Sequence, residues 1–185
     1  GAARLGAHTS LIARVGTDSF SQIGFTLWQA VGIHTHAVIR DPDQPTGMAM
    51  IAVDEAGANT IIVIAGANYA LTIDNVNAAA RTISDAHALI AQLEVPLEAT
   101  THAFRLARQH GVKTILNPAP AYPLPHELLA HVDYLTPNET ELQTLCGSST
   151  SDIEAAARTL LTTEQQTVIV TLGERGAQYI TRQTS

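Results

Sequence analysis

Short apolar runs alternate with segments of helical periodicity along most of this 185-residue chain. An apolar run bounded by turn residues predicts a buried strand, whereas apolar residues at every third or fourth position predict a helix. Regular alternation of the two favours an α/β fold, in which helices cover both faces of a mainly parallel sheet. The strands are expected at residues 10–15, 88–93, 113–116, 134–136, 167–171 and 177–181. The helices are expected at residues 21–31, 73–82, 96–110, 139–146 and 152–161.

One segment breaks this alternation. Residues 47–53 and 60–65 are two apolar runs that flank the turn-forming stretch Asp54-Glu55-Ala56-Gly57-Ala58-Asn59, which predicts a β-hairpin. In both runs apolar side chains alternate with other apolar side chains, so both faces of the hairpin are apolar. A hairpin of this kind is not stable with both faces in water. We expect the rest of the domain, a ligand or a second subunit to cover it.

Composition limits the partners that the chain can have. A hydrophobic content of 45% is in the range of globular proteins, and a net charge of −7 argues against nucleic acid as a ligand. An acidic chain can still bind ATP, because Mg²⁺ and backbone N–H groups carry much of that recognition. Cys146 is the only cysteine, which fits a cytoplasmic protein without disulfides, and no apolar run is long enough to predict a membrane span. The eight histidines are scattered and form no recognisable set of metal ligands.

In parallel sheets ligands bind at the carboxyl ends of the strands, so the residues that follow each apolar run are the candidates for a site. The first candidate is Glu94, in Gln92-Leu93-Glu94, because a carboxylate can accept hydrogen bonds from two neighbouring hydroxyls of a polyol. The alternative is that Glu94 is simply a solvated acid at a strand end.

The second candidate is Thr136-Pro137-Asn138-Glu139-Thr140-Glu141. Asn138 suits a helix N-cap, and the helix dipole favours acids in the first turn, so a structural interpretation accounts for the segment. The functional interpretation is that Asn138 and Glu141 organise the water shell of Mg²⁺-ATP, because magnesium keeps several waters and takes few protein ligands.

The third candidate is Thr171-Leu172-Gly173-Glu174-Arg175-Gly176. A strand that runs into two glycines lets the backbone approach a ligand closely, although an ordinary hairpin turn would have the same composition. The chain contains neither a Walker-type P-loop nor a Gly-x-Gly-x-x-Gly fingerprint.

Taken in order, these segments resemble the PfkB-type carbohydrate kinases of the ribokinase type. Each match is weak alone, and the order and spacing of the set carry the resemblance, which covers nearly the whole chain. The matching segments are Ala2-Ala3-Arg4-Leu5-Gly6-Ala7, Val15-Gly16-Thr17-Asp18-Ser19-Phe20, Pro45-Thr46-Gly47, Ala65-Gly66-Ala67-Asn68, Gln92-Leu93-Glu94, Asn117-Pro118-Ala119-Pro120, Thr136-Pro137-Asn138-Glu139-Thr140-Glu141 and Thr171-Leu172-Gly173.

The resemblance implies a ribokinase-like three-layer α/β/α domain over residues 1–185, with a lid hairpin at about residues 46–65. It implies that Glu94 contacts the sugar, that Asn138 and residues 171–176 (Thr171, Leu172, Gly173, Glu174, Arg175 and Gly176) contact ATP, and that Glu141 is associated with Mg²⁺. The lid hairpin would close over the sugar and also join two subunits in a homodimer, which would cover its apolar faces. The activity implied is transfer of a phosphoryl group from ATP to the 5-hydroxyl of D-ribose.

The departures from the family pattern concern the ends of the chain. The family's N-terminal strand, its Gly-Gly-Lys-Gly-x-Asn segment and its Gly-Ala-Gly-Asp segment have no counterpart here, and the last of these holds the catalytic Asp. The chain starts at Gly1 and ends just after a predicted strand, so we expect a sequence incomplete at both ends, with the catalytic Asp beyond Ser185 and no activity for residues 1–185 alone. A monovalent cation, K⁺, is implied for the intact enzyme. Two alternatives stay open, namely a relative that phosphorylates a nucleoside or another sugar, and a non-catalytic binding or dimerisation module.

Overall fold

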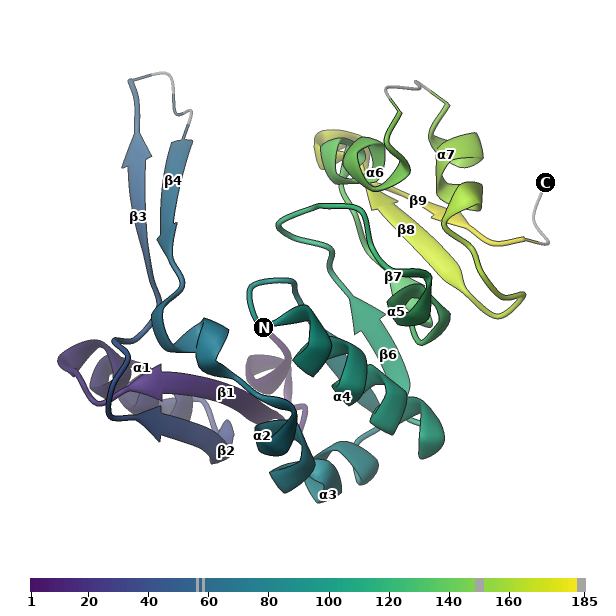
Figure 1. The fold of residues 1–185 in the computed structure, drawn as a ribbon. Helices are drawn as coiled ribbons and strands as arrows, with labels where there is room; N and C mark the ends of the chain where they lie inside the picture. The colour runs from purple at the N-terminus through teal and green to yellow at the C-terminus, as the bar shows by residue number, and fades with distance from the viewer. Residues whose placement is uncertain (56, 58, 149–151, 183–185) are drawn as a thin grey trace. The chain divides into compact units, whose positions relative to one another are not determined.

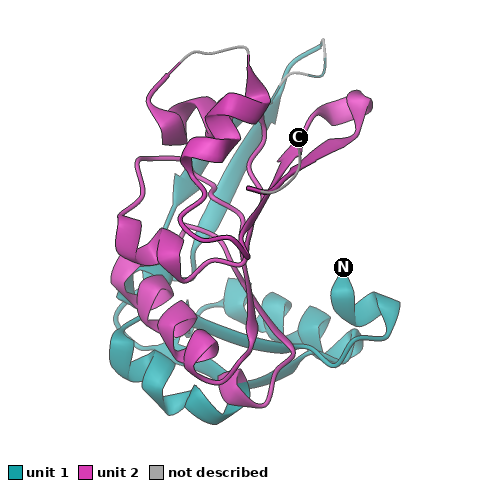
Figure 2. Cartoon of the chain, turned by 90° about the vertical axis from the view of Figure 1, so that its right-hand side faces the viewer, with its two compact units in different colours: residues 1–82 teal, residues 83–185 magenta. Residues whose placement is uncertain are grey.

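The computed structural model describes residues 1–55, 57, 59–148 and 152–182. The chain divides into two compact units, residues 1–82 and 83–185 (Figure 2). Residues 56 and 58, in the predicted hairpin turn, lie outside the described residues.

The first unit is built on a parallel pair of strands joined by a helix (Figure 1). Its elements are η1 Ala2–Leu5, β1 Ser10–Gly16, α1 Ser19–Ala30, β2 His34–Asp41, β3 Met48–Val53, β4 Asn59–Ile64, η2 Gly66–Ala70, α2 Ile73–Ala78 and the start of α3 Ala80–Ser84. Strand β2 was not expected from the sequence, because its apolar run is only the three residues 37–39, flanked by His36 and Arg40. The helix expected at residues 73–82 is two short helices, with a capping box between Thr72 and Asn75 at the start of α2.

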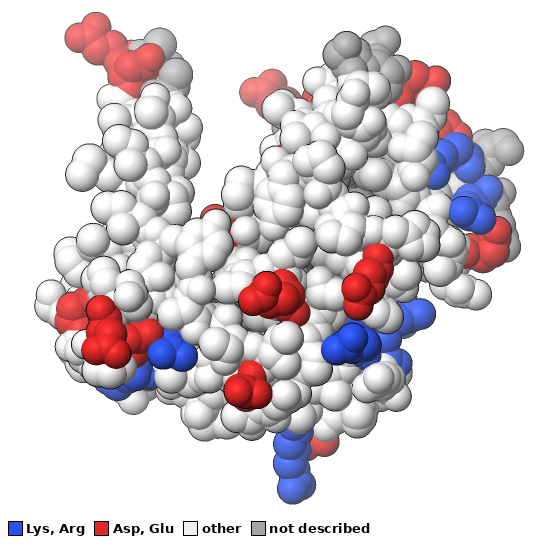
Figure 3. Space-filling view, in the orientation of Figure 1, with Lys and Arg blue, Asp and Glu red and all other residues white. Residues whose placement is uncertain are grey.

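The predicted hairpin is confirmed in the first unit. Strands β3 and β4 pair antiparallel in a register that runs from Met48 opposite Ile64 to Val53 opposite Asn59. They rise from the β1–β2 pair as an isolated ribbon (Figure 1). Every residue of the two strands except Met48 is exposed. Neither strand contains a charged side chain, so the hairpin in Figure 3 is uncharged below its acidic tip. Both apolar faces are therefore open to solvent in this chain.

The second unit contains the larger sheet, with strand order β5-β6-β7-β8-β9. Strands β5 to β8 are parallel, and β9 is antiparallel to β8. The strands are β5 Ala88–Ala91, β6 Lys113–Leu116, β7 Tyr134–Leu135, β8 Thr167–Thr171 and β9 Ala177–Ile180. The helices are α4 Leu97–Gln109, α5 His126–Ala130, α6 Glu139–Cys146, α7 Ile153–Thr159 and the short η3 Gly173–Arg175. This mostly parallel sheet with its helices confirms the predicted α/β class.

The core of the second unit lies between the sheet and its helices. The side chains of Phe104, Leu116, Leu128 and Val170 are fully buried in it, and α6 contributes Leu142. Burial of a side chain of this size stabilises the fold by about 1.5–3 kcal/mol relative to exposure. The helices that follow the strands are thus fixed to the sheet by their apolar residues, which also fixes the loops between them.

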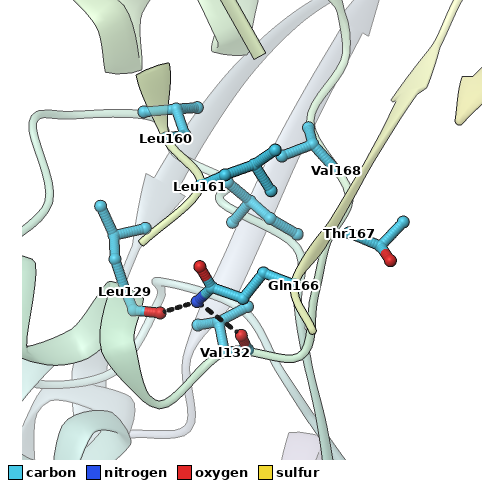
Figure 4. A pocket seen from close by; sticks show the side chains of 8 residues that line it. Leu129, Val132, Leu160, Leu161, Gln166, Thr167 and Val168 are labelled. Atoms are coloured by element: carbon cyan, nitrogen blue, oxygen red, sulfur yellow. Dashed lines mark hydrogen bonds between the residues drawn. The ribbon is translucent and has the colours of Figure 1, made fainter. Parts of the chain in front are cut away.

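Two buried polar side chains brace this core from within. Asp133 accepts hydrogen bonds from the backbone N–H of Thr114 at 2.9 Å and from its hydroxyl at 3.1 Å, and it pairs with Arg108. Gln166 donates from Nε2 to the carbonyls of Leu129 and Val132, at the edge of a small apolar cavity (Figure 4). The two side chains tie the starts of β6, β7 and β8 to one another, at the end of the sheet opposite the predicted site.

Among the described residues, every helix is too short or too polar to cross a lipid bilayer.

Candidate functional site

The parallel register of β5 to β8 brings the three predicted site segments to one edge of one sheet. Each segment directly follows a strand: Glu94 comes after β5, Asn138 after β7 and Gly173 after β8. Neighbouring strands lie about 4.8 Å apart, so Glu94 is set off from the end of β7 by about 10 Å and from the end of β8 by about 14 Å. The sheet therefore places all three segments of the second unit along a single edge.

The segments after β7 and β8 are in direct contact. Asn138 forms a parallel β-bridge with Thr171, and the backbone N–H of Thr171 donates to the carbonyl of Pro137 at 2.9 Å. The pairing of β7 with β8 thus continues past both strand ends into the predicted nucleotide site. Residues more than thirty positions apart in the sequence form one continuous surface.

Asn138 and Glu141 form a capping box at the start of α6. The side-chain oxygen of Asn138 accepts from the N–H of Glu141 at 2.8 Å, and Oε2 of Glu141 accepts from the N–H of Asn138 at 2.8 Å. The structural interpretation of this segment is therefore confirmed. The capping box occupies only one carboxylate oxygen of Glu141 and leaves the side-chain amide nitrogen of Asn138 without a hydrogen bond among the described residues. Both groups remain available to a ligand.

The segment after β8 is a tight turn whose backbone is exposed. The 3-10 helix Gly173–Arg175 leads into β9, with Gly173 at φ +59° and Gly176 at φ +87°, a region that L side chains rarely adopt. The N–H of Leu172 donates to the carbonyl of Gly176 at 2.8 Å, which closes the turn. The turn is the β8–β9 hairpin connection, and its glycine backbone also leaves space for a flat or charged ligand, since no atom lies within 4 Å of a Cβ built at either glycine.

An ion pair holds this turn against α6. The guanidinium of Arg175 lies 2.6 Å from a carboxylate oxygen of Glu139, and the hydrogen bond to Glu139 raises the pKa of Arg175. Both side chains are substantially exposed, so the pair contributes little to stability. Its geometric effect is to hold the turn after β8 beside the N-terminus of α6.

The loop after β6 connects the Glu94 end of this edge with the end formed by the segments after β7 and β8. Asn117 donates from Nδ2 to the carbonyl of Thr136 at 3.0 Å, and the N–H of Leu93 donates to the carbonyl of Ala119 at 2.9 Å. Sequence reasoning gave Asn117 no role in the site. Its position after an apolar run is the signal that marked the other three segments, and here it braces two strand ends.

Glu94 stands alone at the β5 end of this edge. Its side chain is exposed and makes no hydrogen bond to any residue that the structure describes. The loop that carries it is fixed, because Leu93 is buried and bonded to Ala119. The carboxylate thus has both oxygens free on a firm support, which suits either a hydroxyl-bearing ligand or a solvated acid.

The donor set of this edge fits Mg²⁺-ATP better than a protein-bound metal. No group of three or more His, Cys, Asp or Glu side chains within the described ranges could hold a metal ion. Magnesium bound with a nucleotide takes its ligands mainly from phosphate and water and needs only one or two carboxylates nearby. Glu141, with one carboxylate oxygen free, fits that requirement.

Comparisons with known proteins agree with this geometry. A family model described as "pfkB family carbohydrate kinase" matches residues 1–185. The ribokinase of Staphylococcus aureus is 39% identical over 186 residues, with 99% of this chain and 61% of that protein covered. The bifunctional ribokinase/ribose-5-phosphate isomerase A of Fructilactobacillus sanfranciscensis is 43% identical over 183 residues, with 97% of this chain and 34% of that protein covered. The deoxyribokinase of Salmonella typhimurium is 36% identical, with 98% of this chain and 60% of that protein covered.

Solved structures of ribokinases have the same fold as this chain. The ribokinase of Thermotoga maritima superposes with a TM-score of 0.87 at 31% identity, and 99% of this chain and 60% of that chain are covered. The ribokinase of Arabidopsis thaliana, complexed with ribose and ATP, superposes with a TM-score of 0.82 at 27% identity, with 99% and 61% covered. The chain spans about three fifths or less of the length of the relatives named here. Because the family model matches the whole of residues 1–185, the chain belongs to the pfkB family of carbohydrate kinases.

Proposed function

We propose that this chain belongs to an ATP-dependent sugar kinase that transfers the γ-phosphoryl group of ATP to the 5-hydroxyl of D-ribose. The observation that carries the proposal is the shared edge of the β5–β8 sheet, with an unpaired carboxylate at one end and an exposed glycine turn beside a helix N-terminus at the other. The ribokinases among the relatives support ribose as the acceptor.

The nucleotide half of the proposal rests on the segments after β7 and β8. The exposed turn of residues 171–176 would lie against the nucleotide, and the side-chain amide of Asn138 would donate to it. The free carboxylate oxygen of Glu141 would accept hydrogen bonds from the water shell of Mg²⁺. The metal, bound to the phosphates, would neutralise the charge that develops on the transferring group.

The sugar half of the proposal rests on Glu94. A carboxylate with two free oxygens accepts from two neighbouring hydroxyls, which selects for a polyol and fixes its orientation. The span of about 10–14 Å between Glu94 and the segments after β7 and β8 is comparable to a sugar followed by a phosphate chain. The lid hairpin at residues 46–65 would close over the sugar and exclude water, so that ATP is not hydrolysed.

Activity is tested on the polypeptide produced from the complete reading frame, with a coupled assay for ADP and a panel of ribose, deoxyribose, fructose and nucleosides. We expect the highest kcat/KM with ribose. Glu94→Ala should raise the KM for ribose at least tenfold and leave the KM for ATP within twofold. Glu98→Ala, which removes another exposed glutamate at the start of α4, is the matched control. If Glu94→Ala changes only the KM for ATP, the role given to Glu94 is wrong.

Two further parts of the proposal concern the complete enzyme. The resemblance implies a catalytic Asp in a Gly-Ala-Gly-Asp segment, and residues 1–185 do not contain that segment. Residues 1–185 alone should therefore show no turnover, and normal turnover by them would refute this. A requirement for K⁺ rests on the resemblance as well, and replacement of K⁺ by Na⁺ in the same assay tests it. The cytoplasmic setting suggested by the single cysteine stays a prediction.

We also propose a homodimer formed through the hairpin. Its support is exposure on both faces: Ile61 and Ile62, which point to opposite faces, are 51% and 59% exposed. One face would cover the sugar and the other would contact the second subunit. Ile61→Lys and Ile62→Lys place a charge on one face each and remove no buried contact. We expect one variant to be monomeric by light scattering and the other to raise the KM for the sugar. If both variants remain dimeric, the dimer does not form through this surface.

A specific observation keeps a second acceptor in view. A deoxyribokinase is 36% identical over nearly the same residues, close to the identity of the ribokinases. The substrate panel decides between the two sugars by the ratio of their kcat/KM values. Dimerisation without turnover on any substrate would favour the non-catalytic module instead.

A further inference from the structure

The hairpin leaves the first unit through a very tight junction. The chain enters β3 through residues 42–47 and leaves β4 through residues 65–68. A Cβ built on Gly47 would lie 2.7 Å from the carbonyl oxygen of Ala65 and 2.7 Å from the side-chain nitrogen of Asn68. The N–H of Ala67 donates to the carbonyl of Pro45 at 2.8 Å, which ties the two sides of the junction together. These contacts therefore hold the incoming and outgoing segments of the hairpin against each other.

Asp41 holds the first half of the incoming loop. One oxygen of its buried carboxylate accepts from the N–H of Asp43 at 2.8 Å and from that of Gln44 at 3.0 Å. The other oxygen accepts from the guanidinium of Arg14 in β1 at 2.7 Å. These bonds end at Gln44, so they do not reach residues 45–47, which lead directly into β3.

Asp18 holds the second half of the loop. Its Oδ2 accepts from the N–H of Thr46 at 2.7 Å, and its Oδ1 accepts from the Thr46 hydroxyl at 2.7 Å and from the N–H of Ser21 at 3.0 Å. The Thr46 hydroxyl also accepts from the N–H of Gly16 at 3.0 Å. The Asp18 carboxylate thus caps α1 and also accepts two hydrogen bonds from Thr46, which lies two positions before β3. The same bonds, that from the Thr46 N–H first, lower the pKa of Asp18 below its ordinary value of 3.8.

The contact between Gly16, Asp18 and Thr46 leaves no space for a side chain at position 16. A Cβ on Gly16 would lie 2.6 Å from the nitrogen of Thr46 and 2.7 Å from Oδ2 of Asp18, so any side chain at position 16 would push the loop away. Gly16 itself is buried at the end of β1. The end of β1, the N-terminus of α1 and the start of the hairpin therefore meet on one carboxylate.

We propose that Asp18 is the positioning residue of the hairpin, because its carboxylate fixes the angle at which β3 and β4 leave the β1–α1–β2 base. A small change in this angle moves the far end of the hairpin by a large distance. Six residues of extended strand reach about 20 Å, so a rotation of about 10° at the base moves the far end by about 3.5 Å. The inference rests on the proposed function only for its consequence, since a lid displaced by that distance would no longer cover a sugar. Asp18 acts through Thr46 and touches no reacting atom.

The test separates the mechanical claim from the enzymatic one. Asp18→Ser keeps a side-chain oxygen that can cap α1, but a serine has one oxygen and is too short to hold both groups of Thr46. Asp43→Ser, which removes an exposed acid from the same loop, is the matched control. Spin labels on cysteines at Glu55 and Gln29, both exposed, report the distance between the hairpin and α1 in residues 1–185 carrying Cys146→Ala.

We expect a narrow distance distribution in the parent and in Asp43→Ser, and one at least 3 Å broader or shifted in Asp18→Ser. An unchanged distribution in Asp18→Ser overturns the proposal. If Asp18→Ser does not fold, as judged by the fluorescence of Trp28, then Thr46→Val serves instead, because it removes the hydroxyl and keeps the shape of the side chain. The same outcomes apply to that variant.

Kinetics on the complete polypeptide then test the consequence. Asp18→Ser should raise the KM for the sugar at least fivefold, with the KM for ATP within twofold and an unchanged urea midpoint for the second unit. A broader distribution without a change in the sugar KM would keep Asp18 as the anchor of the hairpin and would remove the lid from the proposed function. Absence of activity in the parent would refute the proposed function, whereas the spin-label result would still decide this inference.

Discussion

Asn138 is given two roles, and substitutions at this one position can separate them. Its side-chain oxygen caps α6 through the N–H of Glu141 at 2.8 Å, and we propose that its side-chain nitrogen donates to ATP. Asn138→Ala removes both. Loss of an N-cap costs about 1 kcal/mol, and at this chain length 1 kcal/mol lowers the melting temperature by about 2–4 °C. Loss of one neutral hydrogen bond to the nucleotide, about 1 kcal/mol, weakens ATP binding about fivefold.

Asn138→Asp separates the two effects. Aspartate caps a helix as well as asparagine does, so the free energy of unfolding should stay within about 0.5 kcal/mol of the parent. The new charge would face the phosphates, and two like charges about 5 Å apart repel by about 3 kcal/mol at an effective dielectric constant near 20. We therefore expect ATP affinity to fall more than tenfold in Asn138→Asp, although this variant is the more stable of the two.

The assays are urea unfolding followed by circular dichroism and calorimetric titration with Mg²⁺-ATP, both on the complete polypeptide. Thr140→Ala, an exposed substitution in the same helical turn, is the control and should change neither quantity. An ATP dissociation constant within twofold of the parent in Asn138→Asp would refute the placement of this side chain against the nucleotide. Equal losses of stability in Ala and Asp variants would refute the cap.

Three further predictions follow from the described contacts. Asp133→Ala leaves the buried N–H of Thr114 without its acceptor and removes the ion-pair partner of Arg108, so it should lower the free energy of unfolding by about 3 kcal/mol in a urea titration. The pKa values of Asp18 and Asp41 are lowered below 3.8, by the bonds from the Thr46 and Asp43 amides first, so the stability they contribute is complete above pH 3.8 and is lost as the pH falls through their folded-state values. Tryptophan fluorescence in acid titrations should show this loss, and substitution of either aspartate by asparagine should reduce it. Arg175→Gln should change the urea midpoint little, because the ion pair is exposed, and should raise the KM for ATP several-fold, because the turn is no longer held on α6; an unchanged KM would count against that role.

The sequence predicts the second unit well because its strands are bounded by strong signals. Gly111 and Gly147 end helices in the left-handed region, and Asn138 caps α6 as its position suggests. Strand β2 was missed because five of its eight residues are polar, and the break at Ala79 was missed because no glycine or proline marks it. Local composition cannot reveal an element whose stability comes from its neighbours.

The sequence predicts which segments form the candidate site, but it does not predict the contacts between them. The rule that ligands bind at the carboxyl ends of parallel strands selects Glu94, Asn138 and Gly173 from the sequence. Two contacts join residues from different segments of the chain: the ion pair of Arg175 with Glu139 and the hydrogen bonds of Asp18 with Thr46. No periodicity or spacing in the sequence predicts either contact.

The bare hairpin has a consequence for how the protein survives in a crowded solution. Strands β3 and β4 pair only with each other among the described residues, so each keeps an unpaired edge of backbone amides and carbonyls next to apolar side chains. Such an edge is a template for β-aggregation and a target for chaperones and proteases. A dimer formed through the hairpin would cover this edge and so protect the protein from aggregation and proteolysis. Dilution of such a dimer should increase proteolysis at concentrations where the activity per molecule is still unchanged.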